Sequence, residues 1–146
     1  MAEVRRQIHV PLMADESVRN PHSAMQVIRR GAADIANVYV TEAGGLQAAA
    51  RIFAMCEAAS IPCMIGSMPE FGIGTAAQIH LGVAMTNLGP DSDTCGVLYH
   101  AEDLLTRPLR IEHGFAYPPE GPGLGIEIDM AVLERWHQNA PAAATA

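Results

Sequence analysis

Residues 9–25 read HVPLMADESVRNPHSAM and contain the first strand-to-helix connection of the chain. The apolar run near the start of this stretch predicts a buried strand, which stops at two adjacent acids, Asp15 and Glu16. Asn20 suits a helix N-cap, and Pro21 suits the first position of the helix that follows. A buried strand that ends in carboxylates and leads into a helix is typical of an α/β protein.

The same alternation of short strands and amphipathic helices continues along the chain. It predicts parallel strands joined by right-handed crossovers. The tail of the chain differs, because it is dense in proline and glycine before a last short helix. The expected strands are residues 10–14, 34–40, 61–68 and 94–101, and the expected helices are residues 21–30, 46–59, 75–88 and 130–137.

The composition is that of one globular domain without a basic surface. The chain has 146 residues, 49% of them apolar, and a formal net charge of −7. We therefore expect neither nucleic acid as a partner nor a signal peptide or membrane span. The three cysteines lack a CxxC spacing, which predicts reduced thiols in a cytoplasmic protein. All nine basic residues are arginine, so no lysine is present to act as a base.

Side chains suited to catalysis or binding lie near the ends of the predicted strands. In a parallel α/β array the active groups gather at the carboxyl ends of the strands, so these side chains should share one rim. Carboxylates on one rim suit Mg²⁺, which prefers oxygen ligands, although exposed acids after strands are also common in α/β proteins. The residues concerned are Asp15, Glu16, Tyr39, Glu42, Ser67, Met68, Glu70, Asp93 and Cys95.

Residues 72–77, GIGTAA, suggest a different function. They match the pattern G-x-G-x-x-A ahead of a predicted helix, and Asp91 and Asp93 follow about 20 residues later, as in a dinucleotide-binding turn. The first glycine, however, does not follow the strand immediately, so a flexible loop and a helix start are the alternative. The backbone amides at such a helix start could still bind an anion. A small phosphate- or nucleotide-binding protein that uses Gly72–Thr75 is therefore a second possible function.

Four stretches of the chain together match a known family in order and spacing. The chain resembles the C-terminal barrel of the enolase superfamily (the muconate-lactonizing and mandelate racemase-like enzymes), and most closely the subgroup with muconate cycloisomerases and dipeptide epimerases. The stretches are PLMADESV, ADIANVYVTEAGGL, AMCEAASIPCMIGSMPEFGIGTAAQIHLGVA and GPGLGIEID.

The resemblance implies the C-terminal half of a (β/α)₈ TIM-type barrel, with about four parallel βα units and an irregular C-terminal capping tail. Residues 1–112 would form the partial barrel with strands 5 to 8 of the family. Residues 113–138 would form the capping segment, and residues 139–146 would be a disordered tail.

The resemblance also implies a chemistry and a role for each strand-end residue. In the family, acids at strand ends hold Mg²⁺, which stabilises an enolate formed by removing a proton next to a carboxylate. Asp15 would be a metal ligand, Glu16 would orient a neighbour of the metal, and Asp93 would belong to the substrate or charge network. The substrate-binding positions would be Ser67, Met68 and Glu70.

Tyr39 departs from the family pattern, because it occupies the position of the family's second lysine. A tyrosine with a pKa near 10 is mostly a neutral hydrogen-bond donor at pH 7. A racemase or epimerase needs a proton donor or acceptor on each face of the substrate carbon, whereas a cycloisomerase or a one-base lyase does not. We therefore expect a cycloisomerase or a dehydratase/lyase type of enzyme acting on a small carboxylate, with Tyr39 as a catalytic acid.

The resemblance covers only the later strands of the family barrel. The start, MAEVRRQIHVP, matches the end of the helix before the fifth strand, so the first lysine pair and two of three metal acids are missing. We expect Mg²⁺ binding to be weak or absent and the isolated chain to be inactive. Open strand edges predict a homo-oligomer or a complementary barrel half as partner. The rival interpretation is a non-catalytic remnant or half-barrel assembly module.

Overall fold

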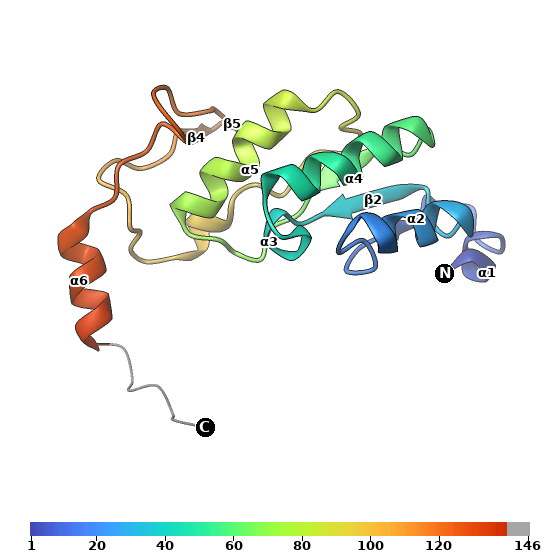
Figure 1. Cartoon of the computed structure of the whole chain (residues 1–146), viewed down its shortest axis with the longest axis horizontal. Helices are drawn as coiled ribbons and strands as arrows, with labels where there is room; N and C mark the ends of the chain where they lie inside the picture. Colours follow the sequence, from blue (N-terminus) through green and yellow to red (C-terminus); the bar gives the residue numbers. More distant parts are fainter. Residues whose placement is uncertain (140–146) are drawn as a thin grey trace.

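Three short parallel strands form the centre of the structure, a computed structural model that describes residues 1–139 (Figure 1). They lie in the order β1-β2-β3, with β2 in the middle. Ala14 lies opposite Ala36, and Ala36 lies opposite Cys63. The α/β fold and the parallel strands predicted from the sequence are therefore confirmed. The strands are β1 (Met13–Ala14), β2 (Ile35–Val38) and β3 (Cys63–Ile65).

Helices follow the strands, as the sequence predicts. The amide of Ser23 donates to Asn20 Oδ1 (2.9 Å) and the amide of Asn20 donates to Ser23 Oγ (3.0 Å), so the predicted N-cap is confirmed as a reciprocal capping box. The predicted helix over residues 75–88 begins and ends earlier than expected. The helices are α1 (Ala2–Arg5), α2 (Pro21–Arg29), α3 (Val40–Ala43), α4 (Leu46–Ala58), α5 (Gly72–Ala84) and α6 (Met130–Asn139).

The core lies between the sheet and the helices that cover one of its faces. Val38 of β2 and Ile65 of β3 are fully buried, as are Ile52 and Phe53 of α4. Alternate residues of a strand point to opposite faces, so the same strands present a second set of side chains away from these helices. Asn37 of β2 points to that second face, which carries the candidate site.

The strand predicted for residues 94–101 is wrong. Residues Gly96–Tyr99 instead form a 3₁₀ helix, η1. The edge of β3 that does not face β2 is already hydrogen-bonded to residues 87–93, which precede the predicted strand. The amide of Cys63 donates to Asn87 O (2.9 Å), and the amide of Asp93 donates to Ile65 O (2.8 Å). Residues 87–93 therefore lie beside β3 where a fourth strand was expected, with a single parallel bridge between Cys63 and Leu88.

The C-terminal part is irregular and lies beyond α5 (Figure 1). It contains a two-stranded hairpin, β4 (Ile111–Glu112) and β5 (Phe115–Ala116), and the helix α6. Trp136 of α6 packs against Phe71, with ring centroids 5.1 Å apart. Within residues 1–139, no helix has the length and apolar character that crossing a membrane requires. Residues 140–146 of the predicted disordered tail lie outside the described residues.

Phe53 should be a main contributor to the stability of this core. Its side chain is fully buried, so Phe53→Ala should lower the free energy of unfolding by roughly 3–5 kcal/mol through lost burial and the cavity left behind. Urea unfolding followed by far-UV circular dichroism measures this change. Phe115→Ala is the matched control, because Phe115 is 67% exposed. Equal effects of the two substitutions would contradict this description of the core.

Candidate active site

Three polar side chains meet at the carboxyl ends of β1 and β2. Asp15 directly follows β1, Asn37 lies within β2, and Tyr39 directly follows β2. The side-chain amide nitrogen of Asn37, Nδ2, donates to Asp15 Oδ1 and to the Tyr39 hydroxyl oxygen, both at 3.1 Å. Asn37 is only 5% exposed, whereas Asp15 is open to solvent. The buried amide therefore fixes the two outer groups relative to each other.

The register of the strands explains this meeting. Because Ala14 pairs with Ala36, the next residues of the two strands, Asp15 and Asn37, are neighbours across the sheet. Tyr39 is two residues beyond Asn37, so its side chain lies on the same face. Gly66, at the end of β3, leaves room for both: a Cβ there would lie 2.5 Å from Asn37 Oδ1 and 2.7 Å from Tyr39 Cε1.

Tyr39 is held in its neutral form by its surroundings. Burial is the main cause that raises the pKa of the Tyr39 phenol well above its ordinary value of 10, and the carboxylate of Asp15 adds to it. The charges of Glu16 and Glu42 act in the same direction. The phenol oxygen accepts from Asn37, and the neighbouring Asp15 carboxylate attracts the phenol proton, so Tyr39 can act only as a proton donor while it stays neutral.

Asn37 is the site residue that the sequence analysis missed. Its Oδ1 atom is buried and has no hydrogen-bond partner among the described residues, an uncommon state for a buried polar atom. The available signal was a polar residue inside the apolar strand DIANVYV, two positions before Tyr39. That spacing places both side chains on one face of the strand.

The predicted pocket residues Ser67, Met68 and Glu70 form a second group after β3. The Ser67 hydroxyl donates to Glu70 Oε2 (2.7 Å), and so does the amide of Met68 (3.0 Å). Glu70 is 9% exposed, whereas the Met68 side chain is 47% exposed. The structure thus brings these three residues together, with Glu70 turned inward and Met68 outward.

The remaining predicted residues, Glu16 and Asp93, lie at the edges of the site. Both side chains are exposed. Asp93 Oδ1 accepts from the Cys95 thiol (3.3 Å). Glu16 affects Tyr39 only through its charge. Within the described part of the chain, no hydrogen bond joins the carboxylate of either residue to Asp15, Asn37 or Tyr39.

The fit of a divalent cation to these residues is incomplete. Asp15 suits a ligand, because its carboxylate is exposed and only its Oδ1 atom accepts a hydrogen bond from the described residues. However, residues 1–139 contain no group of three or more histidine, cysteine, aspartate or glutamate side chains placed to hold a metal ion. These residues do not by themselves fit Mg²⁺, so a site at Asp15 would need further ligands from outside them.

At the glycine motif that suggested a nucleotide site, a side chain of the protein itself already binds the N-terminus of the helix. The amide of Gly72, the first residue of α5, donates to Asp103 Oδ1 (2.8 Å). A Cβ on Gly72 would lie 2.2 Å from Asp103 Oδ2 and 2.4 Å from Leu105 Cδ1. A carboxylate at the start of this helix disfavours a phosphate there, because both groups are negative.

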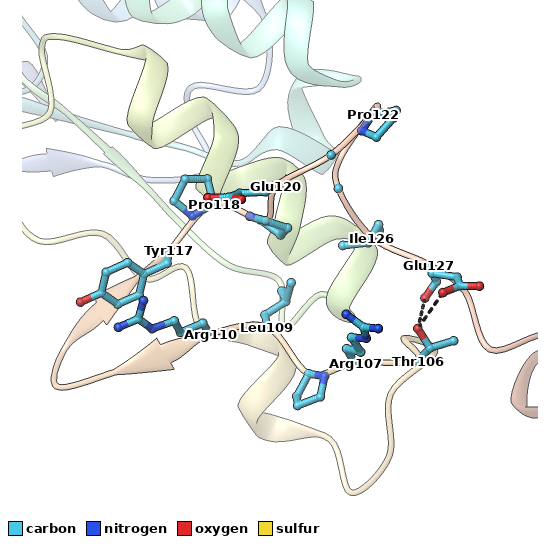
Figure 2. Close-up of a pocket in the computed structure, with 14 residues that line it drawn as sticks. Thr106, Arg107, Leu109, Arg110, Tyr117, Pro118, Glu120, Pro122, Ile126 and Glu127 are labelled. Carbon is cyan, nitrogen blue, oxygen red and sulfur yellow. Dashed lines mark hydrogen bonds between the residues drawn. The ribbon is translucent and has the colours of Figure 1, made fainter.

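A separate hollow of about 790 Å³ lies in the C-terminal part, between residues 106–110 and 117–127 (Figure 2). The Arg110 guanidinium lies over the Tyr117 ring, 3.9 Å from its centroid. None of the predicted site residues lines this hollow. Its walls carry equal numbers of positive and negative side chains and so show no preference for a charged ligand. These side chains are Arg107, Arg110, Glu120 and Glu127.

The fold of this chain is that of a known protein family. A family model described as enolase C-terminal domain-like matches residues 1–132. The chain belongs to this family. The resemblance drawn from the four sequence stretches is therefore confirmed, and the α/β fold is that of the C-terminal barrel domain of muconate cycloisomerases.

The relatives include enzymes that are named as muconate cycloisomerases. Muconate cycloisomerase 1 of Rhodococcus opacus is 42% identical over 139 residues, which are 95% of this chain and 37% of that protein. Muconate cycloisomerase 1-1 of Acinetobacter lwoffii is 36% identical, over 93% of this chain and 36% of that protein. The crystal structure of 2-chloromuconate cycloisomerase from Rhodococcus opacus matches 92% of this chain and 37% of its own chain, with a TM-score of 0.89 and 29% identity. The chain therefore spans a little over a third of the length of these relatives.

The pKa of Tyr39 should fall when Asp15 is neutralised. In Asp15→Asn the negative charge that opposes phenolate formation is gone, so the pKa should move down toward the ordinary value of 10 while burial keeps it from reaching it. The ¹³Cζ chemical shift of tyrosine, followed against pH, measures this, and Tyr39→Phe assigns the signal. Glu3→Gln, which removes an exposed charge elsewhere, should leave the titration unchanged. An unchanged Tyr39 titration in Asp15→Asn would contradict the influence of the Asp15 carboxylate on the Tyr39 phenol.

Proposed function

We propose that this chain is the C-terminal part of an enolase-superfamily enzyme that removes a proton next to the carboxylate of a small substrate. The base that takes up this proton would be supplied from outside this chain, which contains no lysine. The observation that supports this most directly is the group of Asp15, Asn37 and Tyr39 at the ends of adjacent parallel strands. The family assigned to the chain adds support, since its relatives are muconate cycloisomerases and related isomerases.

Tyr39 acts in this proposal as a neutral acid. Its hydroxyl oxygen accepts from Asn37, and its own proton lies beside the Asp15 carboxylate; with substrate bound, this proton would be donated to an enolate oxygen or to a leaving group. The raised pKa keeps the phenol protonated at neutral pH. Ser67 and Met68 would line the substrate pocket beside it, and Asp93 would lie at its rim.

Asp15 would be one ligand of Mg²⁺, with the others supplied from outside the described residues. When bound, the ion would supply electrostatic stabilisation of the negative charge that develops on the substrate carboxylate. Glu16 would help to orient the ligand set through its charge. The isolated chain should therefore bind Mg²⁺ weakly or not at all and should lack activity.

A cycloisomerase or a dehydratase/lyase type of reaction suits this site better than racemisation. Racemisation needs, on each face of the substrate carbon, a group that can take up a proton, and Tyr39 cannot do so at neutral pH because its raised pKa keeps it protonated. No lysine is present in the chain to replace it.

The proposed arrangement also needs a partner for the sheet. In the described residues β1 pairs only with β2, which leaves its outer edge open. We place the partial barrel in residues 1–112 and the capping segment in residues 113–138, and expect a complementary barrel half or a further copy of the chain at the open edge. A non-catalytic assembly module is the second candidate, favoured by the lack of a three-ligand metal group within residues 1–139.

A chimera tests the proposal directly. This chain would replace the matching segment of Rhodococcus opacus muconate cycloisomerase 1, whose remaining part supplies the rest of the barrel. We expect the chimera to cycloisomerise muconate, and Tyr39→Phe in it to lower kcat by about 100-fold, because a positioned acid is lost. Asp15→Asn should in addition weaken Mg²⁺ binding, measured by calorimetry.

Tyr99→Phe is the matched control for this experiment, since Tyr99 is 70% exposed and should tolerate the loss of its hydroxyl. A folded chimera without activity would contradict the enzyme proposal and favour the assembly module. Equal kcat values for the Tyr39→Phe and Tyr99→Phe chimeras would contradict the role of Tyr39.

A further inference from the structure

Glu70 is a buried carboxylate without a basic partner. It is 9% exposed, and none of the ion pairs formed within residues 1–139 includes it. Burying a charge is costly unless hydrogen bonds compensate for the lost water. The neighbours of this carboxylate therefore decide what Glu70 does in the fold.

Three donors from two separate segments, the helix α3 and the loop after β3, satisfy the Glu70 carboxylate. Oε2 accepts from the Ser67 hydroxyl (2.7 Å) and from the amide of Met68 (3.0 Å), both in the loop after β3. Oε1 accepts from the hydroxyl of Thr41 (3.3 Å), which lies in α3, directly after β2. The carboxylate thus connects the segments that follow two neighbouring strands.

The surrounding backbone is shaped around this residue. A Cβ on Gly96 would lie 2.5 Å from the Glu70 amide nitrogen and 2.6 Å from Ser67 Oγ, and a Cβ on Gly74 would lie 2.6 Å from Glu70 Cβ. The Thr75 hydroxyl donates to the Glu70 carbonyl oxygen (3.2 Å). Residues of η1 and α5 therefore pack closely against Glu70 and hold its backbone in place.

We propose that Glu70 is a positioning residue that fixes Ser67 and Met68 at the end of β3. This rests on the proposed function, in which Ser67 and Met68 line the substrate pocket. This role differs from the substrate contact predicted for Glu70 from the sequence, because here Glu70 acts through the segments that follow β2 and β3. Because Gly66 packs against Asn37 and Tyr39, the position of this loop also sets the shape of the site beside Tyr39.

Amide hydrogen exchange of the 146-residue chain, measured by NMR without substrate, tests this proposal. In Glu70→Gln one acceptor oxygen becomes an NH2 group, so the three hydrogen bonds cannot all form, and the remaining acceptor has lost its negative charge, so its hydrogen bonds are weaker. The Met68 amide should therefore exchange at least about tenfold faster. The Gly66 amide, which donates to Val38 O (3.3 Å), should keep its rate. Glu3→Gln removes the same charge at an exposed position and should change neither rate.

A milder pair of variants keeps the test valid if Glu70→Gln does not fold. Thr41→Val removes one donor without touching Met68, and should still speed exchange at Met68 if Glu70 connects the loops. Thr86→Val is the matched control, because the Thr86 hydroxyl also donates to a glutamate, Glu57 (2.7 Å), at an exposed position.

Two outcomes would overturn the positioning role: a uniform rise in exchange at Met68 and Gly66, which indicates only a loss of global stability, or an unchanged Met68 rate. An inactive chimera, by contrast, would contradict the proposed function and leave these exchange rates as they are, because no substrate takes part in them.

Discussion

The parallel pairing of β2 with β1 on one side and β3 on the other is the constraint on which the rest of the structure depends. It places Ala36 opposite both Ala14 and Cys63, so the residues that follow these positions reach one edge of the sheet together. A shift of one residue in β2 would turn Asn37 toward the helices and bring the apolar Val38 to the site. The buried core of Val38 and Ile65 opposes such a shift, so the core and the site are fixed by the same register.

Two carboxylates at this edge show how environment decides the use of one chemical group. Asp15 is exposed and accepts one hydrogen bond from Asn37, so most of its capacity remains free for a cation or a substrate group. Glu70 is enclosed and accepts three, so its capacity is spent within the protein. The residue type is nearly the same in both places, and only the arrangement of donors around it separates an open group from a structural one.

Local signals in the sequence were enough for much of the fold. The N-cap at Asn20, the helix that follows it and the position of Asp15 after a strand depend on neighbours within a few residues, and the structure confirms them. The missing fourth strand depends instead on bonds between β3 and residues 87–93, which no local pattern reports. The importance of Asn37 was hidden for the same reason, since its partners become visible only when β1 and β2 lie side by side.

The contact between α6 and Phe71 has a consequence for how this protein can be observed. The chain contains one tryptophan, and Trp136 lies 5.1 Å from the Phe71 ring, which in turn stacks on His100 at 3.9 Å. Tryptophan emission therefore reports on the attachment of the C-terminal helix and not on the sheet. Far-UV circular dichroism instead averages over all the helices and strands, so the agreement or separation of the two transitions shows whether the C-terminal helix detaches before the rest of the fold melts.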